Sequence, residues 1–135
     1  MRKAQKVDRT VVKEFIQKDK TITCPLKGDY YALIGDNGEI LSALCVTDQR
    51  KKLGYFRIQG MRTEKKNRRK GYSTELLRYA LSHYEGIVHA DAMAMSKGIF
   101  NKLGFKLLEV DESGNHIEYR MERENNVKED GKTTN

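Results

Sequence analysis

The sequence lacks several residue types that often define a protein class. It has no tryptophan, one proline and two cysteines in 135 residues. Cys24 and Cys45 could form one disulfide, but two reduced thiols in a cytoplasmic protein is the interpretation we favour. No Cys/His pair has the spacing of a zinc site, so we expect no metal.

Long hydrophobic runs are also missing. A membrane-spanning helix needs about 18 consecutive apolar residues, and no run in the chain approaches that length. The basic N-terminal segment, residues 1–10, is not followed by an apolar stretch, so we expect no secretory signal. Both absences predict a cytoplasmic protein without a membrane partner.

Acidic residues are scarce in one stretch. Residues 49–70 carry ten basic side chains and a single acid, Glu64, which gives +9, whereas the whole chain carries +7. Such a local excess indicates an anionic ligand or partner, and a solvated charged face is the alternative. Nucleic acid is an unlikely ligand, because the C-terminal half is acidic and the exposed aromatic residues typical of RNA platforms are not evident.

The N-terminal half predicts one helix and three strands. Apolar spacing favours a helix over Asp8–Lys18. Strands are expected over Asp29–Asp36, Glu39–Asp48 and Gly54–Thr63, with a tight turn at Gly35–Gly38. These strands should form an antiparallel meander.

The C-terminal half alternates helices and strands. Helices are expected over Ser73–Tyr84 and Met95–Leu103, and strands over Ile87–Ala92, Phe105–Val110 and Ile117–Arg123. The first of these strands should run parallel to its predecessor, because a helix connects the two. The prediction is an α/β fold with a mixed sheet, a meander followed by β-α-β-α-β-β. Residues 1–123 form a single domain in this interpretation, and residues 124–135 a flexible tail.

The basic stretch ends where a strand leads into a helix. The sequence there is Arg68-Arg69-Lys70-Gly71-Tyr72-Ser73-Thr74. The unpaired N–H groups of a helix N-terminus bind phosphate, and a glycine allows close approach. A Walker loop and a dinucleotide fingerprint do not fit, since Lys70 precedes the glycine and only one glycine is present. The segment therefore predicts a site for a di- or polyphosphate.

This segment resembles the signature of the GNAT family of acetyl-CoA-dependent N-acyltransferases, Gln/Arg-x-x-Gly-x-Gly/Ala. Ser73 replaces the final Gly or Ala. Downstream, Ile99-Phe100-Asn101-Lys102-Leu103-Gly104-Phe105 is similar to the family's helix that ends in Tyr-x-x-x-Gly-Phe. The resemblance covers about residues 29–123. It implies a GNAT-like fold with a shortened N-terminal region.

The resemblance also implies a site for acetyl-CoA as co-substrate. Its pyrophosphate would lie against the loop made of Arg68, Arg69, Lys70, Gly71, Tyr72, Ser73 and Thr74. Met61 and Thr63 match positions whose backbone pairs with pantetheine, where a free N–H would polarise the thioester carbonyl. Phe100 stands where the family often has a tyrosine general acid, and it would belong to the core or to the pantetheine wall.

Catalytic residues are not assigned by the resemblance. In some members a glutamate at the position of Arg57 is the general base, and Gly54–Thr63 holds no carboxylate. Water or one of four side chains could accept the proton instead, and the choice stays open: Asp91, His89, Tyr30 and Tyr31.

The expected function is transfer of an acetyl group from acetyl-CoA to a primary amine by direct attack. The acceptor could be a small molecule, a peptide or a protein, and a group of acids on the last hairpin would attract a cationic amine: Glu109, Asp111, Glu112 and Glu118. One alternative is a non-catalytic CoA-binding regulatory module, which Phe100 and Arg57 favour. The other is a small basic nucleic-acid-binding protein.

Overall fold

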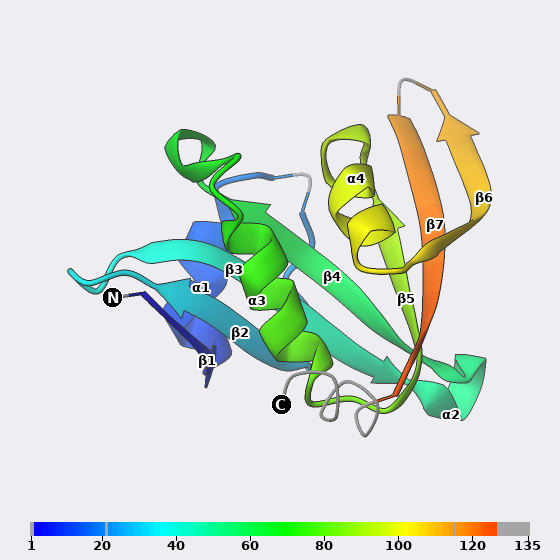
Figure 1. The fold of residues 1–135 in the computed structure, drawn as a ribbon, viewed down its shortest axis with the longest axis horizontal. Coiled ribbons are helices and arrows are strands. Elements are labelled where there is room, and N and C mark those ends of the chain that lie inside the picture. The colour runs from blue at the N-terminus through cyan, green and yellow to red at the C-terminus, as the bar shows by residue number, and fades with distance from the viewer. Residues whose placement is uncertain (1, 21, 115, 127–135) are drawn as a thin grey trace.

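A computed structural model describes residues 2–20, 22–114 and 116–126, which form a seven-stranded mixed sheet with helices on both faces (Figure 1). The strands are β1 (Lys3–Val7), β2 (Asp29–Ile34), β3 (Ile40–Gln49), β4 (Tyr55–Thr63), β5 (Gly86–Ala92), β6 (Lys106–Ser113) and β7 (His116–Asn125). The helices are α1 (Arg9–Gln17), α2 (Arg50–Leu53), α3 (Tyr72–Leu81) and α4 (Ala94–Lys102), with a 3-10 turn, η1 (Lys65–Asn67).

The strand order is β1-β2-β3-β4-β5-β7-β6. Strands β1 to β4 pair antiparallel in sequence order. β5 lies parallel to β4, and the final three strands are antiparallel again. The predicted α/β class, the meander and the parallel pair are therefore confirmed.

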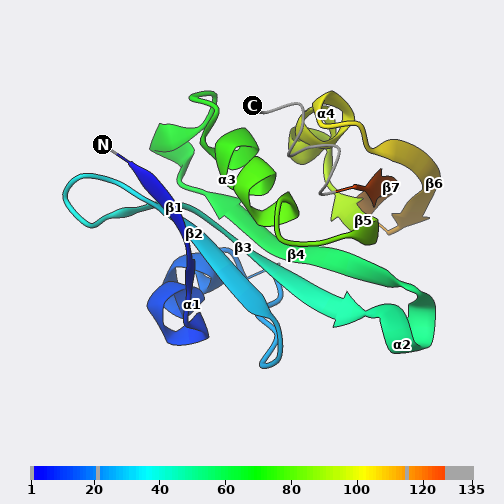
Figure 2. The same cartoon turned by 60° about the horizontal axis from the view of Figure 1, so that its bottom comes forward.

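The helices cover the sheet unevenly. α1 packs Val12, Phe15 and Ile16 against one face of β2 and β3. α3 and α4 lie on the other face, where Leu76 and Phe100 join the main core. Figure 2 shows α1 below the first strands, and α3 and α4 above the sheet. Within the described ranges, no helix covers the α1-side face of β5, β7 and β6.

Two elements differ from the prediction. β1 adds a fourth strand to the meander, and its sequence, Lys-Ala-Gln-Lys-Val, lacks the apolar alternation that marks a strand. As an edge strand it pairs with β2 alone, so this neighbour holds it in place. The segment between the second and third predicted strands forms the short helix α2.

The end of the chain is also corrected. β7 continues through Glu124 to Asn125, although both were expected in a flexible tail. Asn125 is 1% exposed, and its Nδ2 donates to the carbonyl oxygens of Leu81, at 2.6 Å, and Tyr84. The apolar pattern did not reveal this strand end, because a polar amide makes the contact. Residues 127–135 of the predicted tail lie outside the described residues.

No described helix is both long and apolar enough to span a membrane. Cys24 and Cys45 are both free thiols. Burial raises the pKa of the Cys45 thiol to about 11, so this group stays protonated near neutral pH.

Candidate functional site

The loop between β4 and α3 gathers basic side chains at a helix N-terminus. Five of them are exposed: Lys65, Lys66, Arg68, Arg69 and Lys70. Arg69 has φ 66° and Gly71 has φ 80°, both in the left-handed region. That conformation costs a non-glycine residue about 1–2 kcal/mol, so Arg69 is strained and Gly71 is not. The two residues bend the chain sharply where it enters α3.

The first turn of α3 is open to a ligand. Gly71 is the N-cap residue, and no side chain caps this helix end. The Gly71 carbonyl accepts from the Glu75 N–H at 3.0 Å, which begins the helical hydrogen bonds. A Cβ built on Gly71 would meet nothing within 4 Å. Free N–H groups, the positive end of the helix dipole and open space fit a phosphate group.

Ser73, the departure from the family signature, ties the helix to the strand. Its Oγ lies 2.5 Å from Thr63 Oγ1, which also bonds Ser42 Oγ at 2.8 Å. A glycine or alanine could not make this contact. The hydroxyl chain fixes the start of α3 to the ends of β3 and β4, and sequence reasoning had not predicted it.

The only acid of the basic stretch is neutralised locally. Glu64 lies 3.3 Å from Lys18 Nζ and 3.4 Å from Arg62 Nη1. Desolvation acts to raise the pKa of Glu64, but the hydrogen bonds from both cations outweigh it and hold the pKa below its usual value. The carboxylate therefore does little to repel an anion at the loop.

Strands β4 and β5 separate just before the loop. Their ladder runs from Phe56 to Ile58 and ends at the pair Ile58 and Ala90. β4 continues through Gln59–Thr63 without a β5 partner, and this stretch where the two strands are not paired is called the opening between them. Met61 and Thr63, the residues predicted to pair with pantetheine, are in this unpaired segment.

A β-bulge interrupts the pairing of β3 and β4 at the same place. Between β3 and β4, Leu44 faces both Gly60 and Met61, because the register shifts there. Gly60 has φ 67°, and a Cβ on it would lie 2.9 Å from the Thr23 carbonyl oxygen. Only glycine suits this position. The segment before β2 that contains Thr23 therefore lies against the bulge, on the α1 side of the sheet.

The ten basic residues of the 49–70 stretch do not form one patch. Arg50, Lys51 and Lys52 belong to α2, before β4, and the exposed basic residues of the loop follow β4. Arg50 pairs with Asp48 at 2.8 Å and lies over the Phe56 ring. Arg57 pairs with Asp91. Counting charges along the sequence could not separate these groups, because only the folded structure shows that the length of β4 lies between them.

Phe100 belongs to the main core. It is 2% exposed and packs edge-on against Phe105, with ring centroids 5.1 Å apart. This burial agrees with the expectation that Phe100 belongs to the core, and a contact with the pantetheine arm stays a prediction.

Two of the open candidates for the proton acceptor are unsuited. Tyr30 and Tyr31 are each 2% exposed. Burial raises the pKa of both phenols, so they stay protonated. The Tyr30 hydroxyl donates to the Pro25 carbonyl, and the Tyr31 hydroxyl bonds Tyr84 Oη at 2.7 Å.

The remaining candidates, His89 and Asp91, lie on the uncovered face of β5. The ion pair of Arg57 and Asp91 joins β4 to β5 beside the end of their ladder. Asp91 also lies 3.5 Å from Arg120, which lies 3.5 Å from Glu109. Sequence spacing gave no sign of this network, because its members come from four strands.

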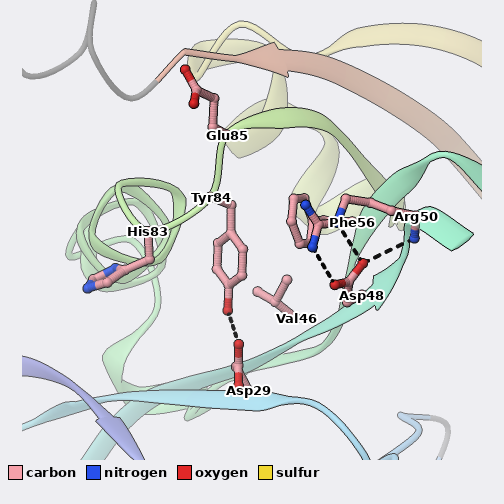
Figure 3. A pocket seen from close by; sticks show the side chains of 8 residues that line it. All are labelled: Asp29, Val46, Asp48, Arg50, Phe56, His83, Tyr84 and Glu85. Atoms are coloured by element: carbon pink, nitrogen blue, oxygen red, sulfur yellow. Dashed lines mark hydrogen bonds and ion pairs between the residues drawn. The ribbon is translucent and has the colours of Figure 1, made fainter.

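A separate hollow of about 460 Å³ lies at the opposite end of α3 from the loop (Figure 3). Its lining is Asp29, Val46, Asp48, Arg50, Phe56, His83, Tyr84 and Glu85. Figure 3 shows the Tyr84 hydroxyl pointing at Asp29, to which it donates at 2.6 Å. Burial and this hydrogen bond raise the pKa of Tyr84. Tyr84 bonds Asp29 and Arg50 pairs with Asp48 within this lining, which indicates a structural corner.

Among the described residues, no group of three or more His, Cys, Asp or Glu side chains could hold a metal ion. The arrangement described above can bind an anion at the loop and receive an extended chain between β4 and β5.

The sheet, its opening and the loop define the fold of the GNAT acetyltransferases. The chain superposes on Escherichia coli ElaA with a TM-score of 0.75 at 15% identity, covering 92% of this chain and 100% of that one. Mutant forms of the spermidine/spermine N-acetyltransferase SpeG from Vibrio cholerae give 0.73 at 7% identity, covering both chains completely. An acetyltransferase of the GNAT family from Staphylococcus aureus Mu50 gives 0.69 at 10%, covering 93% and 100%.

These likenesses confirm the fold that the sequence resemblance implied. No protein-family model matches the sequence, and no curated protein matches it significantly.

Proposed function

We propose that this protein is an N-acetyltransferase that transfers an acetyl group from acetyl-CoA to a primary amine. One observation carries the proposal: the opening between β4 and β5 leads directly to an uncapped helix N-terminus surrounded by basic side chains. An extended thiol arm ending in a pyrophosphate matches this shape and charge. The structural neighbours that are acetyltransferases support the reaction class.

The loop holds the charged end of the co-substrate in this proposal. Backbone N–H groups from Arg69 to Thr74 bind the pyrophosphate, and Arg68 and Lys70 add charge. The pantetheine arm lies against the unpaired edge of Met61 and Thr63. A backbone N–H there stabilises the oxyanion that develops on the thioester carbonyl, a role that needs no particular side chain.

The amine attacks the thioester directly, without a covalent enzyme intermediate. A lysine-like amine has a pKa of about 10.4, so it must lose a proton before it attacks. The thiolate product has a conjugate acid near 8.5, by analogy with cysteine, and leaves without full protonation. The proton acceptor therefore matters more than a general acid, and a buried Phe100 is compatible with the reaction.

Two measurements test the proposal. Thermal unfolding is followed with acetyl-CoA, CoA or a single-stranded oligonucleotide, and thiol release is assayed with spermidine, a lysine peptide and a peptide with a free N-terminus. A ligand at 100 times its Kd stabilises by about 2.7 kcal/mol. We expect a shift with both CoA forms and thiol release with at least one amine.

The other outcomes separate the alternatives. Stabilisation by CoA without thiol release would favour the non-catalytic regulatory module. Salt-sensitive stabilisation by the oligonucleotide alone would favour nucleic-acid binding.

A further inference from the structure

A carboxylate and an imidazole form a pair on the uncovered face of the sheet. Glu122 on β7 and His89 on β5 are directly opposite in the ladder, and Glu122 Oε2 lies 2.7 Å from His89 Nε2. The His89 ring stacks on Tyr55 of β4, with centroids 3.7 Å apart and planes within 3°. The stack and the hydrogen bond together hold His89 in one orientation.

The bonding pattern fixes the role of the imidazole. His89 is 8% exposed, and its Nδ1 is buried without a hydrogen-bond partner among the described residues. The Glu122 carboxylate can only accept, so Nε2 carries the hydrogen and Nδ1 is closed to a substrate. His89 is therefore a donor that orients Glu122. The Glu122 side chain is 38% exposed, so an incoming group can reach it.

The pair lies beside the opening between β4 and β5. His89 pairs with Arg57 in the ladder, one residue before the ladder ends. Asp91 follows His89 by two residues on β5 and forms ion pairs with Arg57 and Arg120. A carboxylate with two cationic partners is a poor proton acceptor. Glu122, which bonds the His89 N–H, is better suited.

We propose that Glu122 accepts the proton of the attacking amine and that His89 is its positioning residue; this rests on the proposed acetyltransferase activity. The ammonium form of the acceptor gives a proton to the Glu122 carboxylate. The nitrogen lone pair then forms a C–N bond with the thioester carbonyl carbon, and the C–S bond breaks. The thiolate takes the second amine proton, and Glu122 returns its proton to solvent.

The experiment compares Glu122→Gln with Glu124→Gln. Glu124 is exposed on the same face of the same strand, so both variants lose one negative charge at a similar place. With the most active amine of the three, we expect Glu122→Gln to lower kcat by about 10²-fold or more, the effect of a general base. Glu124→Gln should leave kcat unchanged. Affinity for acetyl-CoA and the thermal midpoint, measured for both variants, serve as folding controls.

The pH profile of kcat/KM adds a second readout. The acid limb of the wild-type profile should disappear in Glu122→Gln and persist in Glu124→Gln. Other charged or titratable groups face Glu122 from the elements around it, and the control variant leaves all of them in place: Tyr55, Arg57, His89, Asp91, Lys106 and Arg120.

His89 is tested by two substitutions. His89→Gln keeps an N–H that can donate to Glu122, whereas His89→Leu removes the donor. We expect His89→Gln to retain most of kcat and His89→Leu to lose most of it. Equal losses in both variants would mean that the imidazole itself takes the proton, which would overturn the assignment.

The remaining outcomes are decisive. If Glu122→Gln keeps the wild-type kcat, or changes KM alone, Glu122 is not the proton acceptor and the proposed function stands. If the wild type binds acetyl-CoA but releases no thiol with any amine, the proposed function fails and this inference fails with it.

Discussion

The two halves of the sheet differ in what covers them. β2 and β3 lie between α1 on one face and α3 on the other, and their central residues are fully buried. β5 and β7 have α4 on one face only, and the opposite face carries ion pairs and the pair of His89 and Glu122. Apolar packing stabilises the first half, while the second half presents charged groups to solvent. Stability and chemistry are therefore placed on different strands.

The strongest test of this difference compares two isoleucines. Ile16 is fully buried under the first half, and Ile87 is 40% exposed on the uncovered face of β5. Ile16→Ala should lower the free energy of unfolding by about 2–5 kcal/mol. Ile87→Ala should change it by less than about 0.5 kcal/mol. Denaturant unfolding measures both, and similar losses would show that the uncovered face is packed after all.

A smaller effect is expected at the hydroxyl of Tyr84. It donates to Asp29 and contacts the Tyr31 hydroxyl, joining the end of α3 to β2. Tyr84→Phe removes the partner of the buried Tyr31 hydroxyl and one of the partners of Asp29, which keeps its ion pair with Lys6. The substitution should cost about 1–3 kcal/mol. Tyr119→Phe on β7, where the ring lies under Lys97, is the matched control and should cost less than about 0.5 kcal/mol. If urea unfolding gave the same loss of free energy for both variants, the Tyr84 hydroxyl would not have this structural role.

A pair of glycines tests whether the loop backbone is itself the ligand-binding element. Gly71 and Gly104 have φ 80° and 86°, and a Cβ on either would meet nothing within 4 Å. Alanine at either site should cost about 1 kcal/mol, because both adopt the left-handed conformation. Only Gly71→Ala should weaken acetyl-CoA binding, by about tenfold or 1.4 kcal/mol. Calorimetric titration decides, and unchanged affinity would refute the placement of the pyrophosphate.

A further effect concerns pH. Burial raises the pKa of Cys45 from 9.0 to about 11, so the unfolded thiol ionises first as pH rises. The stability that this group contributes is complete below pH 9 and is lost between pH 9 and 11. Cys45→Ala should therefore lose less stability than the wild type between pH 8 and pH 10.5. Urea unfolding of both proteins at pH 8 and pH 10.5 measures the difference.

The parts of the fold that follow a repeating apolar pattern could be predicted. α3 was found because its buried residues recur with the period of a helix, and β2 and β3 because each is a short, nearly continuous apolar run beside the turn at Gly35–Gly38. β1 was missed because its pairing with β2, rather than its own sequence, makes it a strand. Asn125 was assigned to a tail because a buried amide bonded to two carbonyls leaves no apolar signal.

The loop of the candidate site could be predicted because its residues are contiguous. The hydroxyl chain through Thr63 and Ser73, the bulge at Gly60 and the pair of His89 and Glu122 could not. Each depends on strands that meet only after folding, and the last joins residues 33 positions apart. The basic stretch has the opposite problem: its residues are close in sequence and suggest one patch, but they lie at opposite ends of β4.

The amide of Asn125 has a consequence for the order of synthesis. The carbonyls of Leu81 and Tyr84, at the end of the helix that follows the basic loop, both accept a hydrogen bond from this amide on β7. A chain emerging from the ribosome exposes Leu81 44 residues before Asn125. The end of this helix thus acquires its hydrogen bonds from Asn125 only after β7 has been synthesised.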